Sequence, residues 1–125
     1  MIARVWRGVV ARDRRDAYVA YVEATGVAAY RRTPGCRLSA ILTRDLDPGN
    51  PPADDRTVTN AEATERVGVS AFSIWDSETD IQAFAGPDIN AMVLYPEDED
   101  YLLAPSTLVH HHVTSLAIPT TEETR

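Results

Sequence analysis

The sequence predicts an α+β fold in which helices cover one face of a four-stranded antiparallel sheet, in the order β-α-β-β-α-β. Three observations lead to this prediction. β-Branched and other apolar residues gather in four short runs, which is typical of strands. An apolar stripe with helical spacing follows the first run, and helix-capping residues follow the third.

The first half of the chain predicts a strand, a helix and a strand. Residues 2–10, "IARVWRGVV", form the first strand, and residues 12–33 form an amphipathic helix. The helix carries one apolar stripe at i, i+3, i+4 and i+7 spacing: Ala17, Tyr18, Tyr21, Val22 and Thr25. Pro34 and Gly35 end it, and residues 36–46 form the second strand.

Residues 47–64 interrupt the pattern, because they are rich in Pro, Gly, Asn and Asp and show no periodicity. We expect an irregular loop that is longer than most connections in a compact domain. Loops of this length are commonly lids over a binding site or spacers. Both interpretations stay open.

The second half of the chain predicts a strand, short helices and a last strand. Residues 66–75 form the third strand, and Ser77 with Asp80 forms a capping box that opens a short helix. Pro96 starts a further helix, with three acidic residues in its first turns. Residues 106–118 form the fourth strand. The whole order is that of a ferredoxin-like domain over residues 1–118, with a tail at 119–125.

Composition limits the classes of function. A net charge of −7 argues against nucleic acid as a partner. No apolar run approaches a membrane span, and the first residues lack the pattern of a signal peptide. All twelve basic residues are arginine, which excludes a lysine Schiff base. The single cysteine, Cys36, suits a bacterial cytoplasm.

Several stretches resemble the antibiotic biosynthesis monooxygenase family: "ARVWRG", "PGCR", "IWDSETDIQAFAG", "YPEDEDYLL" and "VHHHV". The resemblance covers nearly the whole chain except residues 47–64. It implies a dimeric α/β barrel, in which two copies of the domain press their uncovered sheets together around a cavity. The superfamily hosts cofactor-free oxygenases, haem degraders, cyclases and proteins of unknown role, so the resemblance indicates the fold better than the reaction.

Haem-degrading proteins of this kind are similar to one another in an asparagine, a tryptophan and a histidine. The nearest equivalents here are Trp6, Phe84 and Leu94. All three differ, and no axial ligand for a haem iron remains at that place. We therefore expect no haem, and more generally no bound cofactor and no metal.

Three consecutive histidines, His110, His111 and His112, lie in the last predicted strand. Alternate residues of a strand share a face. Similar proteins tend to have a tyrosine at the place of His111, which suggests that His111 packs against the helices. His110 and His112 would then face the barrel cavity. They are interpreted as two metal ligands, as a general base, or as a polar patch at a strand end.

Four further residues are candidates for the site. Trp6, Tyr95 and Phe84 are predicted to bind the substrate, although each also suits structural packing. Arg4 is predicted to stabilise a negative charge on the substrate, the alternative being a salt bridge at the rim. Arg4 and the two candidates for the base, His110 and His112, form the predicted catalytic set.

The favoured hypothesis is an enzyme of bacterial secondary metabolism, a homodimer that oxidises an aromatic or polyketide-like small molecule with dioxygen and without a cofactor. A deprotonated phenol is able to reduce oxygen directly, so the protein needs only a dry cavity, a base and an anion stabiliser. One alternative is a cyclase, isomerase or dehydratase that uses the same base. Another is a dimer that binds a ligand without catalysis.

Overall fold

The computed structural model describes residues 1–46 and 65–118. The predicted loop 47–64 and tail 119–125 lie outside the described residues. The strands are β1 (Ile2–Ala11), β2 (Cys36–Leu46), β3 (Arg66–Trp75) and β4 (Thr107–His112). The helical segments are η1 (Arg12–Arg14), α1 (Arg15–Val22), η2 (Glu23–Val27), α2 (Ala28–Arg32), α4 (Glu78–Ala85) and α5 (Asp98–Tyr101).

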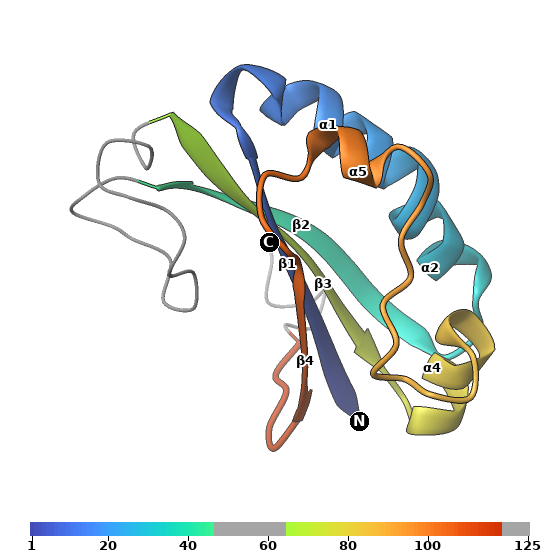
Figure 1. Cartoon of the computed structure of the whole chain (residues 1–125). Helices are drawn as coiled ribbons and strands as arrows, with labels where there is room; N and C mark the ends of the chain where they lie inside the picture. Colours follow the sequence, from blue (N-terminus) through green and yellow to red (C-terminus); the bar gives the residue numbers. More distant parts are fainter. Residues whose placement is uncertain (47–64, 119–125) are drawn as a thin grey trace.

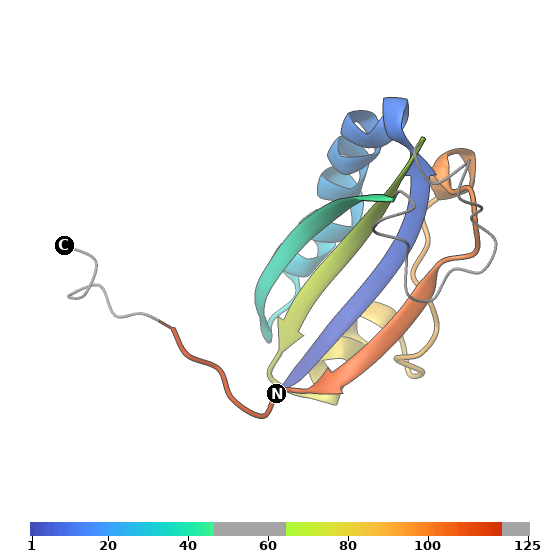
Figure 2. The same cartoon turned by 90° about the vertical axis from the view of Figure 1, so that its left-hand side faces the viewer.

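The four strands form one antiparallel sheet in the order β2-β3-β1-β4. This order confirms the predicted α+β arrangement. Each helical connection joins two strands that are not adjacent in the sheet: the first leads from β1 to β2 and the second from β3 to β4. The helices cover one face of the sheet (Figure 1). No helix of the described part covers the other face, which is turned toward the viewer in Figure 2.

The first helical layer is continuous from Arg15 to Arg32, but its middle turn is wider than an α-helix. Residues Glu23–Val27 form a π-helical turn that includes Gly26. Such turns are rare and frequently lie beside functional sites. Here the turn brings Thr25 and Gly26 to the wall of a cavity between helix and sheet.

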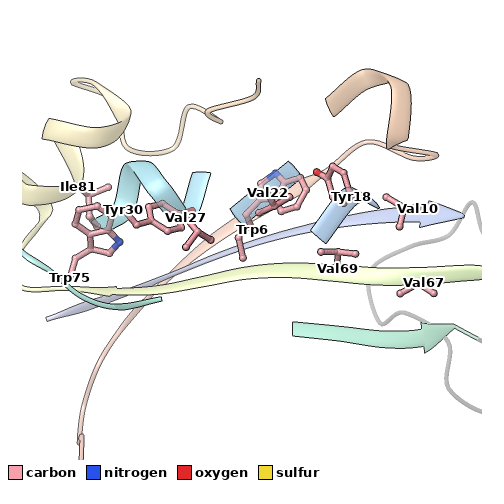
Figure 3. Packing of buried hydrophobic residues seen from close by; sticks show 11 residues of the cluster. Trp6, Val10, Tyr18, Val22, Val27, Tyr30, Val67, Val69, Trp75 and Ile81 are labelled. Carbon is pink, nitrogen blue, oxygen red and sulfur yellow. The ribbon is translucent and has the colours of Figure 1, made fainter. Parts of the chain in front are cut away.

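The core lies between the sheet and these helices (Figure 3). On β1 the side chains of Trp6 and Val10 point to the helices, because alternate strand residues share a face. Eleven buried residues form the main cluster: Trp6, Val10, Tyr18, Val22, Val27, Tyr30, Val67, Val69, Ala71, Trp75 and Ile81. Tyr30, Trp75 and Ile81 lie together near one end of the cluster in Figure 3.

The second helical region is shorter than the first. Ser77 caps α4, since its Oγ accepts a hydrogen bond from the backbone N–H of Asp80, as the capping box predicts. Gly86, with φ of 94°, ends α4 in a conformation that favours glycine. An irregular segment then leads to α5, which begins at Asp98. Among the described residues, no helix is long and apolar enough to span a membrane.

The last strand is shorter than predicted. β4 ends at His112, which pairs with Ile2 at the start of β1. Beyond this pair, within the described part of the chain, the backbone N–H of Val113 still donates a hydrogen bond to the carbonyl of Met1 at 3.0 Å. Residues 113–118 therefore continue without a strand partner, and they lead away from the sheet in Figure 2.

Candidate functional site

A cavity lies inside the protomer, between the helical layer and the sheet. Five of the eleven residues that line it are aromatic: Trp6, Tyr18, Tyr30, Phe84 and Tyr95. Its volume is about 40 Å³, room for about three water molecules. Binding a ligand of several rings therefore requires part of the wall to move. Val93 and Tyr95 belong to the irregular segment between α4 and α5, the part of the wall outside regular secondary structure.

The cavity lies on the side of the sheet that the helices cover. The expected hollow between the sheets of two copies involves a second chain and stays a prediction. The β4 side chains, however, point in other directions than expected. Leu108 pairs with Trp6, and His110 pairs with Arg4, on the face of β1 that packs against the helices. His111 is exposed and points to the opposite face. The prediction that His111 packs against the helices, and that His110 faces away from them, is wrong.

Trp6 forms the floor of the cavity. Its side chain is 8% exposed, and its indole Nε1 has no hydrogen-bond partner among the described residues. Gly8 allows the ring to lie flat along β1, because a Cβ at this position would be 2.7 Å from Cη2 of Trp6. The floor thus presents a buried N–H donor that the protein itself does not satisfy.

Tyr18 and Asp98 form a buried hydrogen-bonded pair in the wall. The Tyr18 hydroxyl donates to Oδ1 of Asp98 at 2.8 Å, and the backbone N–H of Tyr95 donates to Oδ2 at 2.6 Å. Burial, and next the bond to Asp98, raise the pKa of Tyr18 far above its usual value. The Tyr18 hydroxyl therefore stays protonated and keeps donating to the carboxylate.

Arg4 is a buried cation, 2% exposed, behind the wall. Its Nη1 donates to the carbonyl of Ile89 at 2.6 Å and lies 2.9 Å from Nε2 of His110. Its Cζ lies 5.6 Å from the ring centroid of Phe84, which lines the cavity. Burial lowers the pKa of Arg4, yet a guanidinium stays charged in proteins. The site therefore holds positive charge close to the aromatic wall.

The contact with Arg4 defines the protonation state of His110. A guanidinium donates hydrogen bonds and accepts none, so Nε2 of His110 is the acceptor and the ring proton is on Nδ1. Burial, and next the charge of Arg4, lower the pKa of His110. His110 is therefore a neutral imidazole near neutral pH, and its lone pair is engaged by Arg4.

The structure brings together some of the predicted site residues. Trp6, Phe84 and Tyr95 all line the cavity, and Arg4 with His110 lies beside Phe84. His112 is exposed at the end of β4. Within residues 1–46 and 65–118, no three His, Cys, Asp or Glu side chains gather closely enough to hold a metal ion.

Sequence reasoning missed Tyr18, Tyr30 and Asp98 as residues of the cavity. Tyr18 belongs to the predicted apolar stripe of the helix, so its inward direction was expected but its hydroxyl was not considered. Asp98 was interpreted as a helix-capping residue, and it does cap the turn at Tyr95. Its contact with Tyr18 joins residues 80 positions apart, and no local sequence signal reports such a contact.

Comparisons with known proteins show the fold. Neither a family model nor a curated protein matches the sequence. A solved structure of a candidate antibiotic biosynthesis monooxygenase from Nitrosomonas europaea is 17% identical, with a TM-score of 0.56 over 92% of this chain and 100% of that chain. The monooxygenase ActVA-Orf6 of Streptomyces coelicolor, solved with nanaomycin D, is 15% identical, with a TM-score of 0.55 over 95% and 92%.

A third structure, a variant of MhuD with two manganese protoporphyrin IX molecules bound per active site, is 17% identical. Its TM-score is 0.50 over 96% of this chain and 100% of that chain. These identities are too low to carry a function across. The chain has the ferredoxin-like α+β fold seen in structures of antibiotic biosynthesis monooxygenases.

Proposed function

We propose that the protein is a monooxygenase that oxidises an aromatic or polyketide-type phenol with dioxygen and without a bound cofactor. The observation that carries the proposal is a cavity with walls of five aromatic side chains and a buried carboxylate, Asp98, among them. Flat aromatic walls suit a flat aromatic ligand. The charge of Arg4 behind Phe84 favours an anionic form of that ligand.

The chemistry is written for an anthrone-type substrate, a hydroxylated aromatic with an activated ring CH₂ group. Loss of a proton gives an electron-rich anion, which transfers electrons to dioxygen, and a C–O bond forms. The resulting hydroperoxide loses water and leaves a carbonyl group. One oxygen atom thus ends in the product and the other in water, and the substrate supplies all the electrons.

In this proposal Asp98 accepts the substrate proton. It is the carboxylate that lines the cavity, and Tyr18 and the backbone of Tyr95 hold it in place. A carboxylate has further acceptor sites beside these two bonds. Arg4 then stabilises the anion, and His110 positions Arg4. This assignment replaces His110 and His112 as the base, since neither lines the cavity and the lone pair of His110 is engaged by Arg4.

The test is oxygen uptake with 1,8-dihydroxyanthrone, in chelator-treated buffer without added flavin or metal, after subtraction of the rate without protein. We expect catalysed uptake of one dioxygen per product quinone. Asp98→Asn lowers kcat by about a hundredfold, the usual contribution of a positioned base. Asp100→Asn, an exposed acid two residues away, is the matched control and keeps the rate. Turnover of the substrate in the absence of oxygen would contradict the proposal and favour a cyclase or isomerase.

We also propose that the protein is a homodimer that buries the uncovered face of the sheet. This face carries Leu38, Leu42 and Val109, which are 47%, 53% and 43% exposed. β3 and β1 add Phe72 and Val5, which pair with each other on the same face. A contiguous apolar face of this kind is unusual on a monomer and typical of an interface. A second copy of the chain presents the same face, so a two-fold axis closes the pair.

A further inference from the structure

The chain contains two tryptophans, and their indole N–H groups differ in one respect. Nε1 of Trp75 donates to Oγ of Ser73 at 2.9 Å, so this buried donor is satisfied. Nε1 of Trp6 is buried and has no partner among the described residues. A buried donor without an acceptor destabilises a protein, and such exceptions in native structures are few. The exception here lies in the wall of the cavity.

The other buried side-chain N and O atoms around the cavity have hydrogen-bond partners in the described part of the chain. The hydroxyl of Tyr18 donates to Asp98, and the hydroxyl of Thr25 donates to the carbonyl of Tyr21 at 2.8 Å. Both carboxylate oxygens of Asp98 already accept a bond. The indole N–H of Trp6 therefore differs from these neighbours, since it offers a donor and the protein supplies no acceptor.

We infer that the N–H of Trp6 is a ligand-recognition group, which donates a hydrogen bond to an oxygen acceptor on an aromatic ligand. The inference rests on the cavity of the proposed function, but it does not depend on oxidation. A carbonyl or phenolate oxygen that lies in the plane of the indole ring fits this donor, because the N–H bond of an indole points outward in the ring plane. Trp6 thereby selects aromatic molecules that carry such an oxygen over hydrocarbons of the same shape.

The size of the selection follows from the kind of acceptor. A hydrogen bond between neutral groups improves affinity by about tenfold, and a bond to a phenolate improves it by up to about a hundredfold. A ligand without an acceptor leaves the N–H of Trp6 unpaired, so it binds more weakly than a ligand of the same shape that carries an oxygen acceptor.

The experiment compares 1-indanone with indane, two bicyclic probes that differ in one carbonyl oxygen. Protein labelled with ¹⁵N-tryptophan gives two indole N–H resonances, and the Trp6→Phe spectrum assigns them. We expect 1-indanone to move the Trp6 resonance downfield and to leave that of Trp75 in place. We expect the dissociation constant of 1-indanone to be about tenfold lower than that of indane.

Two variants separate the donor from the shape of the ring. Trp6→Phe removes the N–H and part of the ring, and replacement of Trp6 by 3-benzothienylalanine keeps the shape and replaces N–H by sulfur. Both variants bring the affinities for 1-indanone and indane to the same value. The isosteric replacement keeps the test decisive if Trp6→Phe fails to fold. Equal affinities in the wild type, or a tenfold preference that persists in the isosteric variant, would overturn the inference.

The outcomes also separate this inference from the proposed function. A shifted Trp6 resonance without oxygen uptake supports the recognition group and contradicts the oxygenase. Oxygen uptake at the wild-type rate in the isosteric variant, with no shift of the Trp6 resonance, contradicts the recognition group alone. Binding of neither probe at its solubility limit contradicts the cavity as an aromatic-ligand site, and with it both proposals.

Discussion

Arg4 is a cation buried among neutral groups. Its hydrogen-bond partners within the described ranges include the carbonyls of Ile89 and Ala91, the imidazole of His110 and the side chain of Tyr30. Burial of a charge without an opposite charge costs free energy, and proteins retain such arrangements mainly at functional sites. Arg4 also ties the irregular segment after α4 to the sheet, since Ile89 and Ala91 belong to that segment. The same side chain therefore provides the positive charge of the site and holds the segment after α4 in position.

The burial of His110, together with its position beside the charge of Arg4, makes stability depend on pH. The pKa of His110 is lowered in the folded protein, whereas in the unfolded chain it is about 6.5. Below about pH 6.5 the unfolded chain therefore binds a proton that the folded protein does not yet bind. We expect the free energy of unfolding to fall as the pH is lowered from about 6.5 to the folded pKa, and to show no further effect of this group below it.

Urea unfolding between pH 5 and pH 7.5 measures this dependence. His110→Gln keeps an acceptor for Arg4 and removes the titration, so its stability curve is flatter than that of the wild type. His112→Gln is the matched control, because His112 is exposed two residues along the same strand. Curves of equal slope for the His110→Gln and His112→Gln variants would contradict the assignment of the acceptor.

The hydroxyl of Tyr18 is expected to contribute more to stability than that of its helix neighbour Tyr21. Tyr18→Phe removes a buried donor to Asp98, which costs about 1.5–3 kcal/mol for a bond to a charged group. The hydroxyl of Tyr21 accepts a bond from the backbone N–H of Glu97 at an exposed position, so Tyr21→Phe costs about 0.5–1.5 kcal/mol. Chemical denaturation of the two variants gives the comparison. Equal losses in the free energy of unfolding would show that the bond to Asp98 contributes no more to stability than the bond made by Tyr21.

At the scale of elements, β1 determines where the site lies. It is a central strand, and its inward side chains are Arg4, Trp6 and Val10, with Gly8 between the last two. Arg4 provides the charge, Trp6 the floor and Gly8 the room for the indole ring. A single strand thus places three features of the site at a spacing of two residues.

Gly8→Ala is expected to destabilise the protein by about 1–3 kcal/mol through overpacking. The added Cβ would lie 2.7 Å from Cη2 of Trp6 and 2.6 Å from Cδ2 of Leu102, so the indole ring has to shift. Gly68→Ala on the neighbouring strand is the control, because its Cβ meets the nearest side-chain atom, in Arg44, at 3.4 Å. Thermal unfolding measures both. A loss at Gly68 as large as that at Gly8 would contradict the close contact with Trp6.

The bounds of helices and strands were easier to predict from the sequence than the features that depend on contacts between them. β2 and β3 have the predicted bounds, since β-branched runs and adjacent turn residues are local signals. The π-helical turn at Glu23–Val27 was not predicted, because its formation depends on packing against the sheet rather than on a residue pattern. The length of β4 was overestimated, since it depends on where β1 begins.

The sequence predicted a residue of the site only where the periodicity of a single helix or strand determines the direction of its side chain. Trp6 and Phe84 point inward as the periodicity of their own elements indicates, and both line the cavity; their role in binding a substrate stays a prediction. The direction of His110 depends on the register between β4 and β1, which no single strand encodes. Asp98 reaches the cavity through a short helix whose position depends on tertiary contacts.

At the scale of the whole molecule, the two faces of the sheet have different environments. Helices bury one face, and the other keeps Leu38 and Leu42 about half exposed (Figure 2). The segment 113–118, with Leu116 and Ile118 exposed at 44% and 77%, adds apolar surface beyond the sheet. A stable dimer typically buries about 800 Å² of each partner, and the uncovered face of the sheet is the surface that we propose to be buried.

Leu42→Glu is therefore expected to convert a dimer into a monomer. The substitution places a charge on β2, an edge strand of the face that the proposed dimer buries, where burial without a partner is unfavourable. Leu94→Glu is the matched control, because Leu94 is 48% exposed but lies on the segment after α4, on the helical side. Size-exclusion chromatography with light scattering should give twice the 13.8 kDa of one chain for the wild type and for Leu94→Glu, and 13.8 kDa for Leu42→Glu. A wild-type mass equal to one chain would show that the apolar face has no second copy as its partner. The cavity lies within one protomer, so that result would remove the dimer and leave the assignment of Trp6 and Asp98 in place.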